Sequence, residues 1–127
     1  MAAEQAGGPP PTRRRRTVTE YLAIDLDART WVCRRCDHVI GPASEGYKRG
    51  CLVAARDPSE IWRPLIDEKV TFSFDPEWSR VVEFYCPGCG TLIEVELLPP
   101  GHPISDDIRL DLDGLEPDEP AAREAAL

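Results

Sequence analysis

Two pairs of cysteines carry the clearest chemistry in this 127-residue chain. They are the C-x-x-C motifs Cys33–Cys36 and Cys86–Cys89. Two thiolates three residues apart on a tight turn are typical of a zinc knuckle, and two knuckles supply the four sulfurs of a closed tetrahedral site. Because four thiolates leave no open coordination position, we expect a structural zinc ion at Cys33, Cys36, Cys86 and Cys89, and not a catalytic one.

Other interpretations of the two pairs stay open from the sequence. Iron bound by the same four thiolates cannot be told from zinc by spacing. A redox dithiol is disfavoured, because such a pair usually opens a helix in a βαβ unit, whereas Cys86 leads into Pro87 and Gly88. The pairs are separated by 49 residues, against about 15 to 20 in a common zinc ribbon, so we expect an insertion between the knuckles.

The remaining cysteine and the two histidines have less specific surroundings. Cys51 precedes an apolar run and is expected to be buried as a small hydrophobe. His38 follows the first knuckle and is either a substitute ligand or a hydrogen-bond donor to a sulfur, while His102, in P-P-G-H-P, has a structural or partner-facing role. With no phosphate loop, dinucleotide motif or nucleophile elbow, we predict no catalytic and no cofactor-binding residues.

The elements that position the cysteines are predicted to be short strands. Apolar and polar residues alternate with the period of a half-buried strand over 21–26, 31–33, 51–55, 70–74, 81–85 and 92–98. Helix signals are confined to one turn over 57–62, which Pro64 limits. We therefore predict a small β-rich, zinc-ribbon-like domain with a minor helical part and extended tails at both ends.

Charge divides the chain into three regions. Residues 1–16 carry four arginines against one glutamate and are predicted to be a disordered or docking basic arm. Residues 17–115 form the predicted zinc-binding domain, in which spaced apolar residues continue over 108–115. Residues 116–127 are predicted to be a flexible acidic tail. The net charge of −8 makes nucleic acid an improbable partner, because phosphate binding depends on lysine and arginine.

The distribution of apolar residues also bounds where the protein works. No apolar run reaches the roughly 20 residues that cross a bilayer, and the charged, proline-rich N-terminal segment does not resemble a secretory signal. We expect a cytoplasmic protein with free thiols. The tryptophans Trp31, Trp62 and Trp78 are expected in the core, with Trp62 and Trp78 also considered as interface anchors.

Two longer motifs point to a family. The stretch Y-C-P-G-C-G-T-L-I-E-V-E-L-L-P-P-G-H-P-I-S-D-D-I-R-L-D-L covers residues 85–112, and E-Y-L-A-I-D-L-D with W-V-C-R-R-C-D-H lies within residues 20–38. Together they resemble the small subunit of acetone and acetophenone carboxylases over about residues 19–115. The C-P-x-C-G knuckle followed by V-E-x-x-P-P-G-x-P is far more specific than C-x-x-C alone.

The resemblance implies a role inside a larger enzyme. These enzymes are biotin-independent, ATP-dependent ligases that carboxylate ketones with bicarbonate through phosphorylated intermediates. The resemblance places ATP, and any divalent cation, in large hydantoinase A/B-like (oxoprolinase-like) partner subunits. It makes this chain a non-catalytic zinc subunit of a hetero-oligomer. The length is closer to the acetophenone-type subunit and does not fix the ketone.

Two further hypotheses belong to other classes of protein. A zinc-ribbon regulator that binds nucleic acid would use the arginines at 13–16 together with Arg34 and Arg35 in the first knuckle. A rubredoxin-like electron carrier would hold iron in place of zinc and would be coloured. Salt-dependent binding of DNA or RNA tests the first, and metal analysis tests the second.

Overall fold

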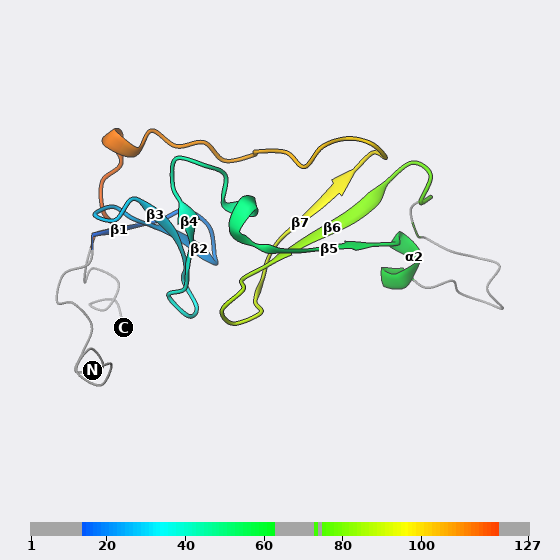
Figure 1. The fold of residues 1–127 in the computed structure, drawn as a ribbon, viewed down its shortest axis with the longest axis horizontal. Helices are drawn as coiled ribbons and strands as arrows, with labels where there is room; N and C mark the ends of the chain where they lie inside the picture. The colour runs from blue at the N-terminus through cyan, green and yellow to red at the C-terminus, as the bar shows by residue number, and fades with distance from the viewer. Residues whose placement is uncertain (1–13, 63–72, 74, 120–127) are drawn as a thin grey trace.

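The computed structural model describes residues 14–62, 73 and 75–119, and these residues form two antiparallel sheets (Figure 1). The four-stranded sheet has the order β1 (Arg15–Thr17), β2 (Leu22–Asp25), β3 (Thr30–Cys33) and β4 (Val39–Pro42). The three-stranded sheet has the order β5 (Leu52–Arg56), β6 (Arg80–Tyr85) and β7 (Leu92–Leu98). The short helices are η1 (Tyr47–Gly50), α2 (Pro58–Ile61) and η2 (Leu112–Gly114). A β-rich fold with few helices is thus confirmed.

Local chemistry accounts for the tight hairpin of the first sheet. The Asp25 carboxylate accepts hydrogen bonds from the backbone N–H groups of Asp27 and Ala28, which closes the turn after β2. Alternation in β2 turns Leu22 and Ile24 into the core, where each is at most 1% exposed. Ala23, on the opposite face, is also only 2% exposed, so β2 is buried on both faces.

The single predicted helical turn is confirmed as α2. The Asp57 carboxylate accepts the backbone N–H of Ser59, and the Glu60 side chain accepts the backbone N–H of Asp57. These reciprocal bonds form a capping box, and Pro58 at the start of the helix fits because its missing N–H needs no partner. The strand predicted over 70–74 lies outside the described residues apart from Ser73.

The main core lies between the first sheet, η1 and the second knuckle. Trp31 and Tyr47 pack edge to face with ring centroids 5.4 Å apart, and the Trp31 indole donates to the Glu45 carbonyl at 2.8 Å. A smaller cluster in the second sheet contains Val82, Phe84 and Leu98. Cys51 packs against both clusters and joins the two cores.

An extended segment, residues 99–119, runs along one side of both sheets, and we call it the strap (Figure 1). It contributes four apolar side chains to the main core, namely Ile108, Leu110, Leu112 and Leu115. Farther along, Asp118 accepts hydrogen bonds from the backbone N–H and the hydroxyl of Thr17. The strap therefore closes the core from the side that the strands leave open.

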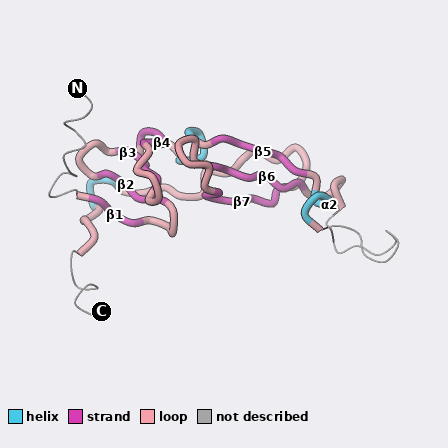
Figure 2. Tube along the Cα trace, turned by 90° about the horizontal axis from the view of Figure 1, so that it is seen from below, coloured by secondary structure: helices cyan, strands magenta, loops and turns pink. Residues whose placement is uncertain are grey.

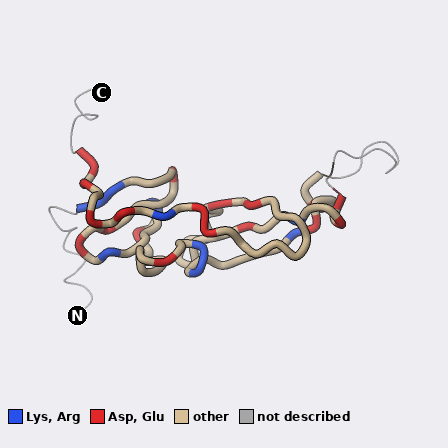
Figure 3. Tube along the Cα trace, turned by 90° about the horizontal axis from the view of Figure 1, so that it is seen from above, with Lys and Arg blue, Asp and Glu red and all other residues tan. Residues whose placement is uncertain are grey.

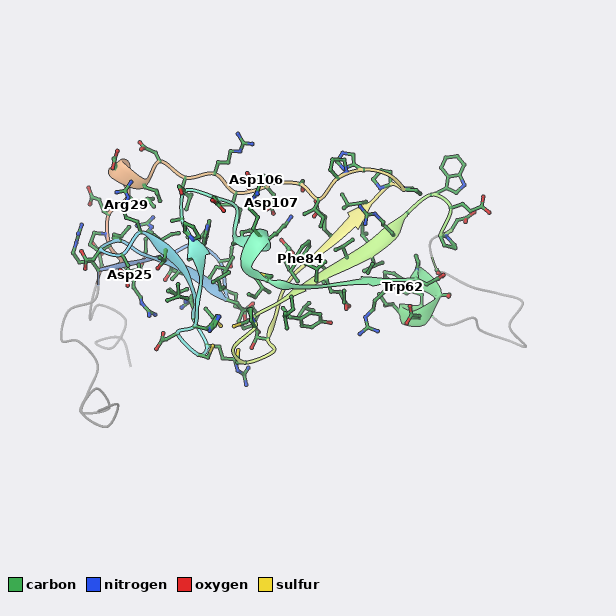
Figure 4. The ribbon with its side chains drawn as sticks, in the orientation of Figure 1. Asp25, Arg29, Trp62, Phe84, Asp106 and Asp107 are labelled. Atoms are coloured by element: carbon green, nitrogen blue, oxygen red, sulfur yellow. The ribbon has the colours of Figure 1, made fainter. Side chains whose placement is uncertain are left out.

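A buried lysine fastens the strap near the junction of the two sheets. The Lys48 ammonium lies 2.9 Å from a Glu96 carboxylate oxygen and 3.2 Å from one of Asp107, and it donates to the Ser105 carbonyl at 3.0 Å. It also lies 5.1 Å from the ring centroid of Phe84. Figure 4 labels Phe84 in the second sheet and Asp107 in the strap. A lysine that is 7% exposed is rare unless paired, and here two carboxylates pair it.

The structure differs from the sequence expectations at several positions. Trp31 is buried as predicted, but Trp78 is 78% exposed, so its expected place in the core is wrong; Trp62 is 37% exposed. Strands β1 and β4 were not predicted. Arg15 and Arg16 lie in β1, and the Asp118 side chain contacts Thr17, so residues on both outer sides of the boundaries expected at 16 and 115 contact the first sheet. Those boundaries themselves stay a prediction.

Candidate metal centre

The four cysteines of the two C-x-x-C pairs converge at the junction of the two sheets. Cys33 ends β3, and Cys86 follows the last residue of β6. The four sulfur atoms all lie within 4.8 Å of one another, so the long insertion between the knuckles does not keep them apart. Within each pair the first cysteine is buried and the second is exposed. The centre is therefore anchored in the core and reaches the surface.

The backbones of the two knuckles are equivalent. In the first, Cys33 N–H donates to the His38 carbonyl at 2.9 Å, and Asp37 N–H donates to the Cys33 carbonyl at 2.8 Å. In the second, Cys86 N–H donates to the Thr91 carbonyl at 2.9 Å, and the N–H of residue 90 donates to the Cys86 carbonyl at 2.8 Å. The fifth residue of each loop has a positive φ, 66° at Asp37 and 77° at the glycine. The two knuckles thus have the same backbone turn.

That conformation explains the residue types after each pair. Glycine adopts a positive φ without steric cost, and aspartate is among the few other residues that tolerate it. Asp37 is also held by an ion pair with Arg15, whose guanidinium nitrogen lies 2.9 Å from a carboxylate oxygen. C-x-x-C followed by Asp or Gly was the sequence signal for this equivalence, and our sequence analysis did not use it.

Backbone and hydroxyl groups are directed at the sulfurs. The N–H of Arg35 donates to the Cys33 sulfur at 3.4 Å, and the N–H of Gly88 donates to the Cys86 sulfur at 3.3 Å. The Thr91 hydroxyl lies 3.0 Å from the Cys89 sulfur and, with the Thr91 backbone, lowers the pKa of that thiol to about 6. Donors of this kind stabilise thiolates, which are the form that binds metals.

The remaining candidate residues lie outside the sulfur cluster. A side chain added at Gly88 would have its Cβ 2.8 Å from the Cβ of His38, so the two knuckles touch at this glycine. His38 therefore packs on the opposite knuckle and is not one of the grouped ligands. Cys51 donates to the Tyr47 carbonyl at 3.5 Å and packs in the core. His102 lies in the strap, and its backbone carbonyl accepts from Arg80.

The sulfur positions fit a four-coordinate metal. Zinc–sulfur bonds of about 2.3 Å place the corners of a tetrahedron about 3.8 Å apart. The closest sulfurs of the two knuckles are 3.8 Å apart for Cys33 and Cys89, and 3.6 Å apart for Cys36 and Cys86. The four cysteines can thus hold a metal ion such as zinc with little movement.

Comparison with known proteins identifies the family. The family described as "Acetone carboxylase gamma subunit" matches residues 17–119. The chain belongs to this family. It is 51% identical over 98 residues to the acetophenone carboxylase beta subunit of Aromatoleum aromaticum, which covers 77% of this chain and 76% of that subunit. It is 27% identical over 88 residues to the acetone carboxylase gamma subunit of Xanthobacter autotrophicus, which covers 68% of this chain and 51% of that one.

The family match spans most of the described residues. Its span begins at Thr17 in β1 and ends at residue 119 of the strap, so it includes both knuckles and both sheets. The resemblance seen in the sequence is confirmed by this match. Among the described residues, no helix has the length and apolar character needed to cross a membrane.

Proposed function

We propose that this chain is the non-catalytic zinc subunit of a biotin-independent, ATP-dependent ketone carboxylase. The observation that carries the proposal is the combination of four converging thiols with membership of the acetone carboxylase gamma subunit family. Relatives named as subunits of acetophenone and acetone carboxylases support an assembly with partner chains. The partners in this proposal are large hydantoinase A/B-like subunits, which hold ATP and the ketone.

The zinc ion in this proposal is structural. Cys33, Cys36, Cys86 and Cys89 would occupy all four positions of a tetrahedral ion, which leaves none for water or substrate. The ion would tie β3 to β6 and so hold the two sheets together. When bound, zinc supplies cross-linking energy and neutralises thiolate charge. The proposed contribution of the chain to catalysis is therefore the shape that it gives to the assembly.

The arginines of the first sheet argue against the nucleic-acid alternative. Arg14 pairs with Asp27 at 2.9 Å, and Arg15 pairs with Asp37 at 2.9 Å. Arg34 donates to the Thr19 and Glu20 carbonyls at 3.2 and 2.9 Å. Side chains that are engaged within the chain are less available for phosphates, and acidic residues are spread along both sheets and the strap (Figure 3).

Co-expression with the large subunits tests the proposal. Hydantoinase A/B-like large carboxylase subunits are expressed together with this chain carrying an affinity tag, and the purified material is analysed for subunits and metal. We expect a stable hetero-oligomer with about one zinc ion per copy of this chain. A chain that never associates with a large subunit, or that binds iron in place of zinc, would contradict the corresponding part of the proposal.

A further inference from the structure

The two faces of the three-stranded sheet have different surroundings. On one face, Val82 and Phe84 belong to the smaller core cluster, and Glu96 accepts hydrogen bonds from Lys48 and from Ser105 in the strap. The strap and η1 therefore cover this face around Phe84 and Glu96, whereas Val53, opposite Phe84 on the edge strand β5, stays 51% exposed. Seen from below, β5, β6 and β7 can be followed along their length (Figure 2).

The pairing register defines the second face. Residues directly opposite one another in neighbouring strands point to the same side of a sheet. Tyr85 is opposite Leu52 and Leu92, Glu83 is opposite Ala54 and Val95, and Val81 is opposite Arg56 and Leu97. We call the surface formed on this side of the sheet the open face; Val81, which is 0% exposed, lies buried beneath it.

The open face is rich in exposed aliphatic side chains. Leu52 is 57% exposed, Leu97 49%, Val95 42% and Leu92 39%. They come from both edge strands and flank the central strand β6. A cluster of exposed large apolar side chains on one face of a sheet marks an interaction site more often than scattered ones do.

The charges on the open face are balanced within it. The Arg56 Nε lies 2.6 Å from a Glu83 carboxylate oxygen, and the Tyr85 hydroxyl donates to the same oxygen at 2.6 Å. Hydrogen bonds from Tyr85 and Arg56 lower the pKa of Glu83, so the pair stays ionised at neutral pH. The face has no net charge, whereas the whole chain has a net charge of −8.

The candidate metal centre fixes one end of the open face. Tyr85 immediately precedes Cys86, and Leu92 immediately follows Thr91, so the second knuckle sets the spacing of β6 and β7 at this end. A change in the geometry of the metal centre would therefore change the shape of the open face through Tyr85 and Leu92.

We propose that the open face docks an apolar, uncharged surface of a large carboxylase subunit. The proposal rests on the proposed function and names the surface through which the assembly forms. Interface cores are depleted in charge and enriched in Tyr and Arg, which matches an aliphatic face whose Arg56 and Tyr85 are both bonded to Glu83. Nucleic acid would need positive charge, which this face does not carry in excess, and a second copy of the chain is an outcome of the test below.

The experiment uses the full chain co-expressed with the large subunits. Val95→Lys places a charge on β7 in the open face, and Leu52→Lys repeats the test on the opposite edge strand. Val39→Lys is the matched control, since Val39 is 55% exposed but lies on β4 in the other sheet. We expect affinity for the large subunits to fall about 30-fold or more in Val95→Lys and Leu52→Lys. Val39→Lys should bind as wild type does, and zinc content and circular dichroism establish that each variant is folded.

The outcomes separate this proposal from the proposed function. If wild type assembles and folded Val95→Lys and Leu52→Lys assemble equally well, the docking face is wrong and the function stands. If wild type does not associate with any large subunit, both proposals fail. If the isolated chain is a dimer that Val95→Lys converts to a monomer, the occupant is a second copy, which overturns our assignment.

Discussion

Replacing Cys86 by serine tests the metal centre most directly. The Cys86 side chain is fully buried, packs in the main core and lies 3.6 Å, sulfur to sulfur, from Cys36 on the other knuckle. The substitution removes one ligand and introduces a hydroxyl into the core. Because serine is a poor zinc ligand, we expect Cys86→Ser to purify without stoichiometric zinc.

The expected loss of stability follows from two magnitudes. A structural zinc site contributes roughly 10–16 kcal/mol in small peptides, which is comparable with the whole net stability of a domain, about 5–15 kcal/mol. The buried hydroxyl alone costs about 1–3 kcal/mol. Loss of zinc is therefore expected to dominate, and Cys86→Ser should be largely unfolded in isolation.

Cys51→Ser is the matched control for the buried hydroxyl. Cys51 packs in the same core but is not one of the four grouped cysteines. We expect it to keep about one zinc ion and to lose about 1–2 kcal/mol. With a urea dependence of about 1–3 kcal/mol per molar, that loss shifts the midpoint by roughly 1 M.

The assay is metal analysis combined with urea unfolding followed by tryptophan fluorescence, since Trp31 lies in the core. A chelator should destabilise wild type and Cys51→Ser but leave Cys86→Ser unchanged. The reasoning is refuted if Cys86→Ser retains one equivalent of zinc and unfolds at the same urea concentration as Cys51→Ser.

Three other perturbations probe the strap and the knuckles. Lys48→Ala leaves two carboxylates without their buried cation and should cost about 3–5 kcal/mol in urea unfolding, whereas the exposed Arg109→Ala should change stability by less than about 0.5 kcal/mol. Burial raises the pKa of Glu96, but hydrogen bonds from Ser105 and Lys48 outweigh it and lower the pKa below the ordinary 4.5. The stabilisation by the Glu96 carboxylate is therefore present above pH 4.5 and lost as the pH falls through its lower pKa in the folded state. The difference in unfolding free energy between wild type and Glu96→Gln should shrink over that pH range. A difference that stays constant would contradict this. Gly88→Ala should cost about 1–3 kcal/mol because its Cβ would meet the Cβ and ring of His38. His38→Gly, which removes these atoms, should restore part of that loss; additive effects would exclude the contact.

Much of the three-stranded sheet follows from simple patterns. Alternation predicted β6 and β7, because Val82 and Phe84 on one face of β6 pack in the core, and exposed residues alternate with less exposed ones along β7. The four metal-centre cysteines were equally clear, since their spacing is a local property of each knuckle. Aspartate at position 57 and glutamate at position 60 also predicted the short helix α2.

The missed elements are edge strands with atypical composition. Strand β4 contains Gly41 and Pro42, which usually weaken a strand, but an edge strand tolerates a proline whose missing N–H faces outward. Strand β1 is mostly arginine and looked like a tail. Charged residues are common at sheet edges because they prevent further pairing.

The buried ion cluster could not be found from local sequence. Lys48 lies in a polar Tyr-Lys-Arg-Gly turn, and its partners Glu96 and Asp107 are 48 and 59 positions away. Periodicity carries no information about pairs that only the strap brings together. The prediction that Trp78 is buried was wrong for a related reason. Tryptophan is mostly buried on average, but the exposure of Trp78 is set by a turn at the end of the sheet.

The strap sets the order in which the parts of this domain fold during synthesis. The hydrogen bonds between Asp118 and Thr17 join residues 101 positions apart, so they form only after nearly the whole domain has been synthesised. Both knuckles leave the ribosome before the strap does. Zinc can therefore bind a nascent chain whose core is still incomplete, and the aliphatic residues of the strap close that core last. We expect emergence of the strap from the ribosome, and not metal capture, to be the step after which this domain reaches its final form.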